Sequence, residues 1–138
     1  MTIQFKSTVR AACLDAIEVA GGASCSLRIY TGAQPADVTQ PNSGTLLAHI
    51  NLPSDWMAAA SGGTKGIAGT WSDASADGGS ASTPGHFRIY NSQATMDGTT
   101  CIIQGSAAIG SGDMNFNGTI TAGQVVTITS FTLTDGNP

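Results

Sequence analysis

The side chains that most often carry catalysis are few in this chain and far apart in sequence. The only glutamate is Glu18, and the two histidines are His49 and His86. Asp73 and Asp77-Gly resemble a calcium loop only faintly, because the ligand at the third position and the terminal glutamate are missing. No nucleophile elbow, phosphate loop, zinc-protease motif or dinucleotide fingerprint occurs. We therefore predict a protein that is not an enzyme and that uses no cofactor or metal.

The cysteines do not form a metal or redox motif. Cys13, Cys25 and Cys101 are odd in number and contain no Cys-x-x-Cys pair, and the two histidines add no paired zinc ligands. A cytoplasmic chain keeps its thiols reduced. We interpret the three as small buried hydrophobes. A disulfide formed late, within or between subunits, is the alternative.

The charge balance excludes several classes of partner. The chain has 138 residues, five Lys and Arg against nine Asp and Glu, and a net charge of −4. So few basic residues cannot form the stripe that binds nucleic acid or an anionic membrane. No apolar run approaches the roughly 20 residues of a membrane span. The first 22 residues lack the continuous apolar core of a signal peptide. We expect a soluble protein made in the cytoplasm.

The tripeptide Arg-Ile-Tyr occurs twice, within SLRIYTGA (26–33) and HFRIYNSQ (86–93). In each run a large hydrophobe and the isoleucine alternate with Arg and Tyr, which predicts a strand with one buried face. One interpretation is that the Arg and Tyr residues stack on an exposed sheet face. The other is that they form part of a protein contact surface, because both types are common interface anchors. These residues are Arg28, Tyr30, Arg88 and Tyr90.

The N-terminal segment is the one clear helix, predicted over residues 6–21. Ser7 is a candidate N-cap, and Gly21-Gly22 is a candidate stop. The apolar face is expected to consist of residues at helical spacing: Val9, Cys13, Ile17 and Ala20.

After the helix the hydrophobic period changes to two. We predict strands at 26–31, 45–52, 67–72, 86–91, 99–106, 114–117 and 124–133, with long loops at 32–44 and 73–85. Short strands separated by Gly-rich turns favour a β-sandwich or jelly-roll. The expected fold is mainly β: a single domain over 1–138, with the helix beside an antiparallel β-sandwich at 25–134.

The two tryptophans, Trp56 and Trp71, are interpreted as core or subunit-contact residues. An exposed tryptophan on a β-sandwich could instead form a sugar-binding platform, so a carbohydrate-binding module remains an alternative.

The order of segments resembles a family of small proteins encoded among the structural genes of tailed bacteriophages. The resemblance covers nearly the whole chain through packing and turn motifs: STVRAACLDAIEVA, LRIYTGAQPA, GTLLAHINLPSDW, AGTWSDASADG, PGHFRIYNS, CIIQGS and AGQVVTITSFTLTDGN. It implies a virion structural protein of the β-sandwich or jelly-roll type that decorates capsids as a cement protein, often as a trimer. No catalytic residues are implied.

The expected function is therefore capsid decoration in the virion, after synthesis in the host cytoplasm. The expected partners are the major capsid protein, other virion proteins and further copies of this chain as a homo-oligomer. The alternatives are a tail, collar or baseplate component and a carbohydrate-binding or receptor-binding module. The contact residues proposed are Arg28, Tyr30, Arg88, Tyr90, Trp56 and Trp71. Residues 1–6 are a candidate arm that pairs with a neighbour's sheet edge.

Overall fold

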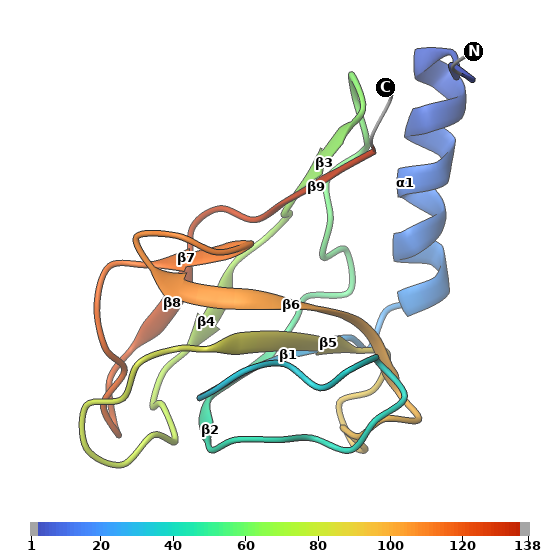
Figure 1. Ribbon diagram of the computed structural model, residues 1–138. Helices are drawn as coiled ribbons and strands as arrows, with labels where there is room; N and C mark the ends of the chain where they lie inside the picture. Colours follow the sequence, from blue (N-terminus) through green and yellow to red (C-terminus); the bar gives the residue numbers. More distant parts are fainter. Residues whose placement is uncertain (1–2, 136–138) are drawn as a thin grey trace.

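The first element along the chain is an α-helix, α1 (Ser7–Gly21). Figure 1 shows the computed structural model, which describes residues 3–135. The N-cap position is Lys6, which provides no side-chain cap, so the prediction of a Ser7 cap is wrong. The helix ends at Gly21 because Gly22 has a positive φ of 73°, as the Gly-Gly pair predicted.

The central element is a five-stranded sheet that curls into a half-barrel (Figure 1). Its strand order is β2-β1-β5-β6-β7. The strands β2, β1, β5 and β6 pair antiparallel, whereas β7 runs parallel to β6. Their bounds are β1 (Ser26–Tyr30), β2 (Leu46–Asn51), β5 (His86–Tyr90), β6 (Cys101–Ile109) and β7 (Met114–Phe116).

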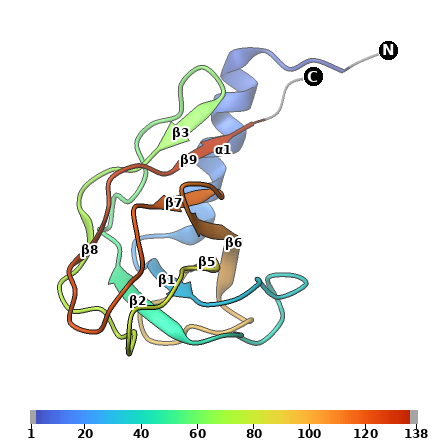
Figure 2. The ribbon, with the colours of Figure 1, turned by 60° about the vertical axis from the view of Figure 1, so that its left-hand side comes forward.

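Two small antiparallel sheets complete the β structure. β3 (Thr64–Gly66) pairs with β9 (Thr132–Thr134), and β4 (Trp71–Asp73) pairs with β8 (Val126–Ile128). Figures 1 and 2 both place the β3–β9 pair beside α1, at the end of the molecule away from the central sheet. The helix is therefore attached to the β body along its length through this pair.

The core lies between the central sheet and the small sheets. The large residues that alternate along β1 and β5 are buried as predicted: Leu27, Ile29, Phe87 and Ile89. A series of aromatic contacts extends this core, with ring centroids 5.3 to 6.2 Å apart: Trp56 with Trp71, Trp71 with Phe131, and Phe131 with Phe87. Rings at these separations pack favourably.

Two strand predictions are wrong in detail. The segment 124–133 is not one strand but two, because Phe131 enters the core between β8 and β9. The segment 67–72 is strand only at its end, because Gly69 adopts a positive φ before Trp71 begins β4. The strand β3 is absent from the predictions, since Thr-Lys-Gly has no apolar alternation.

The predicted fold class is confirmed at its coarser level: the chain is mainly β with one N-terminal helix. The prediction of a wholly antiparallel sandwich is wrong, because β6 and β7 are parallel. The curled five-stranded sheet with two small sheets is not clearly a jelly-roll sandwich.

Candidate functional site

The two Arg-Ile-Tyr runs are adjacent strands of one sheet. β1 and β5 pair antiparallel, and Arg28 lies directly opposite Arg88 in the register. The repeated tripeptide therefore reflects a shared structural position.

The prediction that these Arg and Tyr side chains point to solvent is wrong for three of the four. Arg88 and Tyr90 are 0% exposed and Tyr30 is 3% exposed, while Arg28 alone keeps partial exposure. The reason is that the loop 31–45 folds over this side of the sheet and is bonded to it by Arg88 and Tyr90. Of the proposed contact residues on this face, only Arg28 is available to a partner in this conformation.

Arg88 connects this loop to the sheet. Its guanidinium donates to the carbonyl oxygens of Val38 (2.6 Å) and Gln40 (3.1 Å) and to Asn42 Oδ1 (2.7 Å). Its Nε also donates to Cys101 Sγ at 3.2 Å. Within residues 3–135 no carboxylate forms an ion pair with Arg88. Neutral oxygens therefore satisfy a fully buried cation, which is a structural arrangement that exposes no charge to a ligand.

The two tyrosines join the same network. Tyr90 donates to Asn42 Oδ1 at 2.7 Å, and the hydroxyl oxygens of Tyr30 and Tyr90 lie 3.0 Å apart. Burial is the main cause that raises the pKa of Tyr90 above its usual range. The phenol therefore stays protonated and acts as a hydrogen-bond donor in the interior.

The buried thiols are also held in their neutral form. Burial raises the pKa of Cys25 to about 11 and raises that of Cys101 despite the nearby Arg88 guanidinium. A thiol is nucleophilic only as the thiolate, so this environment opposes reactivity. The prediction of buried cysteines is confirmed for these two and is wrong for Cys13, which is exposed on α1; all three are free.

Both histidines have lowered pKa values. His86 is fully buried, and its ring stacks on Tyr30 while Nδ1 donates to the Gly32 carbonyl oxygen at 2.9 Å. Burial is the main cause of the lowered pKa of His86 and of His49. Ser106 lies opposite His86 in the β5–β6 register, but its hydroxyl bonds to Asp113, and within residues 3–135 neither imidazole is hydrogen-bonded to a serine, threonine or cysteine side chain.

Trp56 and Trp71 are both 0% exposed. The Trp71 indole donates to the Ala68 carbonyl oxygen at 3.1 Å. The prediction that they are core residues is confirmed, and a sugar-binding platform formed by either ring is excluded by its burial. For the same reason, neither tryptophan is accessible to a partner subunit in this conformation.

An ionic contact attaches α1 to the body and was not predicted from the sequence. Lys65 of β3 is only 1% exposed, and its ammonium lies 2.7 Å from Asp15 and 2.9 Å from Glu18, both on α1. It also donates to the Ala58 carbonyl oxygen at 2.8 Å. The signal in the sequence was two acids three positions apart on one helix, which places them on the same face.

A shallow groove lies over this contact, with a volume of about 450 Å³. Its lining includes the acids Asp15, Glu18 and Asp55, and Lys65 is at its base. Because Lys65 already binds two of the three acids, the groove offers no free carboxylate pair for acid–base chemistry. Within residues 3–135 no cluster of His, Cys, Asp and Glu is placed to hold a metal ion, and no helix is long and apolar enough to cross a membrane.

The body-facing side of α1 carries all of the helix's charged residues. Arg10 forms an ion pair with Asp135, and its guanidinium packs against Gly63. Asp15 and Glu18 bind Lys65. Leu14 and Gly21 are buried on the same side. The predicted apolar face is wrong for Val9, Cys13 and Ala20, which are exposed, and is confirmed for Ile17, which packs against the core.

The opposite side of α1, termed here the outer face, has no charged residue and is almost entirely apolar. Val19 is 81% exposed and Val9 is 45% exposed. The other exposed residues of the helix, apart from Ser7 at its start, are small or uncharged: Thr8, Ala12, Cys13, Ala16 and Ala20. Soluble helices normally turn their charges to water and their apolar stripe to the core. In α1 the charged side chains are ion-paired with the body, and the outer face is exposed.

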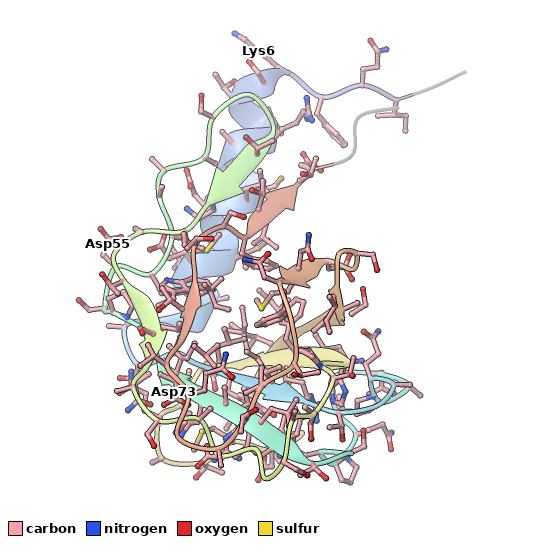
Figure 3. All side chains as sticks on the ribbon, turned by 90° about the vertical axis from the view of Figure 1, so that its left-hand side faces the viewer. Lys6, Asp55 and Asp73 are labelled. Carbon is pink, nitrogen blue, oxygen red and sulfur yellow. The ribbon has the colours of Figure 1, made fainter. Side chains whose placement is uncertain are left out.

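Lys6 directly precedes α1, at the end of the helix that lies away from the central sheet (Figure 3). Figure 3 shows it at the tip of the molecule, whereas Asp55 and Asp73 are much closer to the β body. Residues 3–6 precede the helix without regular structure, and both Ile3 and Phe5 are exposed. Residues 1–2 of the proposed N-terminal arm lie outside the described residues.

The comparisons with known proteins give no relative. No protein-family model, curated protein or solved structure matches this chain.

Proposed function

We propose that this protein is a non-enzymatic virion structural protein that decorates or cements the outside of a tailed-bacteriophage capsid. Its partners are the major capsid protein, other virion proteins and further copies of itself. The observation that supports a contact role is the outer face of α1, an apolar helix surface exposed to water. The phage assignment comes from the family resemblance of the sequence.

An exposed apolar face of this kind is typical of an interaction site. Exposed apolar residues scattered singly are normal, but a contiguous patch marks a contact with a protein or membrane. Here Val9, Ala12, Ala16 and Val19 follow one another along a single helix surface. The small and β-branched side chains lose little conformational entropy when they are covered. The surface therefore suits a protein that is packed into an assembly.

Decoration would act by mass action. A protein that binds only the assembled shell stabilises the shell over its dissociated parts, and the effect grows with the number of bound copies. Such a role requires contact surfaces rather than a catalytic pocket. It also agrees with the burial of Cys25, Cys101, His86 and Tyr90, whose shifted pKa values keep these groups neutral in the core.

The experiment is to measure the copy number of this protein per purified phage particle by quantitative mass spectrometry, relative to the major capsid protein. Hundreds of copies in simple proportion to the capsid protein are expected. A dozen or fewer would contradict decoration and favour a neck, tail or baseplate position. Complete absence from particles would contradict any structural role in the virion.

Two matched variants test whether the outer face provides the contact. Val19→Glu introduces a charge on the outer face, and Val125→Glu introduces the same charge at an exposed valine next to β8. We expect the Val19 variant to bind particles at least about tenfold more weakly, because a charge buried in a contact must be desolvated. The Val125 variant should bind as the unmodified protein does. Equal binding by both variants would remove the outer face as the contact surface.

A further inference from the structure

The pattern of residues on the outer face is symmetric about the middle of the helix. Leu14 is the central residue of α1, which spans residues 7–21. Val9 and Val19 lie equally far from Leu14 on either side, and so do Ala12 and Ala16. The spacing of these four residues alternates between three and four positions, which is the spacing of a helix–helix seam. The face is thus a seam whose second half repeats the first in reverse order.

We propose that the outer face of α1 pairs with the same face of a second copy of this chain, with the two helices antiparallel about a two-fold axis that passes between Ala12 and Ala16, at the level of Leu14 along the helix. This inference rests on the proposed function in that it names the partner of the same surface. A two-fold contact places one patch against an identical patch. An antiparallel pair centred on Leu14 sets Val9 against Val19 of the second copy and Ala12 against its Ala16.

The electrostatics of the helix suit such a pair. A charged face would repel its own copy. Arg10 and Glu18 are ion-paired with the body, and Asp15, whose side chain is 47% exposed, is neutralised by the Lys65 ammonium. The helix also has no acid in its first turn, no base in its last turn and no side-chain N-cap. Its dipole is therefore not compensated by its own side chains. An antiparallel neighbour brings the opposite end of a helix dipole to each terminus.

The shape also permits close approach. The alanines at the centre of the seam allow the helix axes to approach to about 8 Å, the lower end of the usual range. Figures 1 and 2 show the β body on one side of α1 only. Two copies that face each other through their outer faces therefore place their β bodies on opposite sides of the pair.

The size of the seam predicts a weak pair in solution. If the helix is treated as a cylinder about 22 Å long and about 10 Å in diameter, one half of its side surface is roughly 350 Å² per copy. The total stays near or below the ~1,000 Å² of a stable interface, which is the range of transient complexes. Association should therefore depend on protein concentration.

The native Cys13 provides a direct probe. It is exposed on the flank of the seam, next to the helix midpoint. In an antiparallel pair, residues on this flank face their own counterparts, so the two Cys13 thiols come close together. In a parallel pair this flank faces the opposite flank, and the two thiols lie on different edges of the seam.

The test uses purified full-length protein, sedimentation over a range of concentrations up to about 1 mM, and cross-linking with a short bis-maleimide. A monomer–dimer equilibrium is expected, with dimers cross-linked through Cys13. Val19→Glu should weaken dimerisation at least about tenfold, while Val125→Glu should leave it unchanged. Cys13→Ser should abolish the cross-link and keep the sedimentation behaviour.

Other outcomes overturn the proposal. A protein that stays monomeric at every concentration, a trimer, or a dimer unaffected by the Val19 charge would each contradict the two-fold helix pair. A monomer whose particle binding still depends on Val19 would refute the pair but keep the proposed function, with another virion chain on the outer face. A helix-paired dimer that is absent from particles would refute the proposed function and keep the pair.

Discussion

The Arg88→Met substitution removes the guanidinium that connects the loop 31–45 to β5 while filling much of its space. Three charged hydrogen bonds to loop oxygens are lost, at Val38, Gln40 and Asn42. A hydrogen bond to a charged group contributes about 1.5–3 kcal/mol. The loss is reduced because the loop can open to water and because a buried charge no longer has to be desolvated. We expect a net destabilisation of about 3 kcal/mol.

The thermal consequence follows from the length of the chain. For 138 residues the entropy of unfolding is about 290 cal/mol/K, so a loss of about 3 kcal/mol lowers Tm by about 10 °C. The matched control is Arg28→Met on the neighbouring strand, directly opposite Arg88. The Arg28 side chain makes no hydrogen bond or ion pair within residues 3–135, and its buried Nε has no hydrogen-bond partner. Its replacement should change stability by less than about 1 kcal/mol.

Urea titrations followed by circular dichroism would measure both variants, with thermal melts as a second readout. An unchanged slope with a lower midpoint for Arg88→Met would show lost stability rather than a changed unfolded state. Limited proteolysis should cleave the loop 31–45 faster in this variant. Equal midpoints for the two methionine variants would refute the assignment of Arg88 as the residue that holds the loop.

Three further predictions concern the rest of the chain. Gly21→Ala should destabilise the protein by about 1–3 kcal/mol, because a Cβ would lie 2.8 Å from the Trp56 ring. The control Gly66→Ala, whose Cβ meets nothing within 4 Å, should lower the free energy of unfolding by less in the same urea titration. The free energy of unfolding should fall as the pH drops below about 6.5, because burial lowers the pKa of His86 and the unfolded chain therefore takes up the proton first. Between pH 7.5 and 5.5 the urea midpoint of His86→Gln should shift less than that of the unmodified protein. An equal shift in both proteins would contradict this assignment. A thiol reagent should modify Cys13 alone in the native protein and all three cysteines in urea, and fast native labelling of more than one thiol would contradict the buried positions of the other two.

The parts of the fold that depend on local periodicity could be predicted from the sequence. The alternation in β1 and β5 identified Leu27, Ile29, Phe87 and Ile89 as core residues, and the Gly-Gly pair marked the end of α1. Helical spacing did not identify which side of α1 packs on the body. Val9 and Cys13 form as regular a stripe as Arg10 and Leu14, and only the ion pairs made by the folded β body decide between the two.

The burial of Arg88 could not be predicted either, because it depends on contacts that are distant in sequence. A strand with alternating Arg and Tyr normally turns these residues to water. Here the loop 31–45 supplies oxygens from residues 46 to 50 positions away in sequence. Conversely, the loop has few apolar residues of its own, so no pattern in its sequence predicts that it covers the sheet.

The use of the basic residues determines what kind of contact the surface can make. Of the five Lys and Arg residues, Arg10, Lys65 and Arg88 are bound to oxygens of the chain itself. Lys6 and Arg28 form no ion pair within residues 3–135. With so few available cations, a contact between two copies of this chain would draw mainly on apolar area and on neutral polar groups. Apolar contacts are not screened by salt, whereas exposed ion pairs are. The proposed self-association should consequently be retained, or strengthened, when NaCl is raised from about 0.05 to about 0.5 M. Sedimentation at several salt concentrations would measure the dimer fraction. A steep loss of dimer with added salt would show that charged groups, rather than the outer face of α1, hold the copies together.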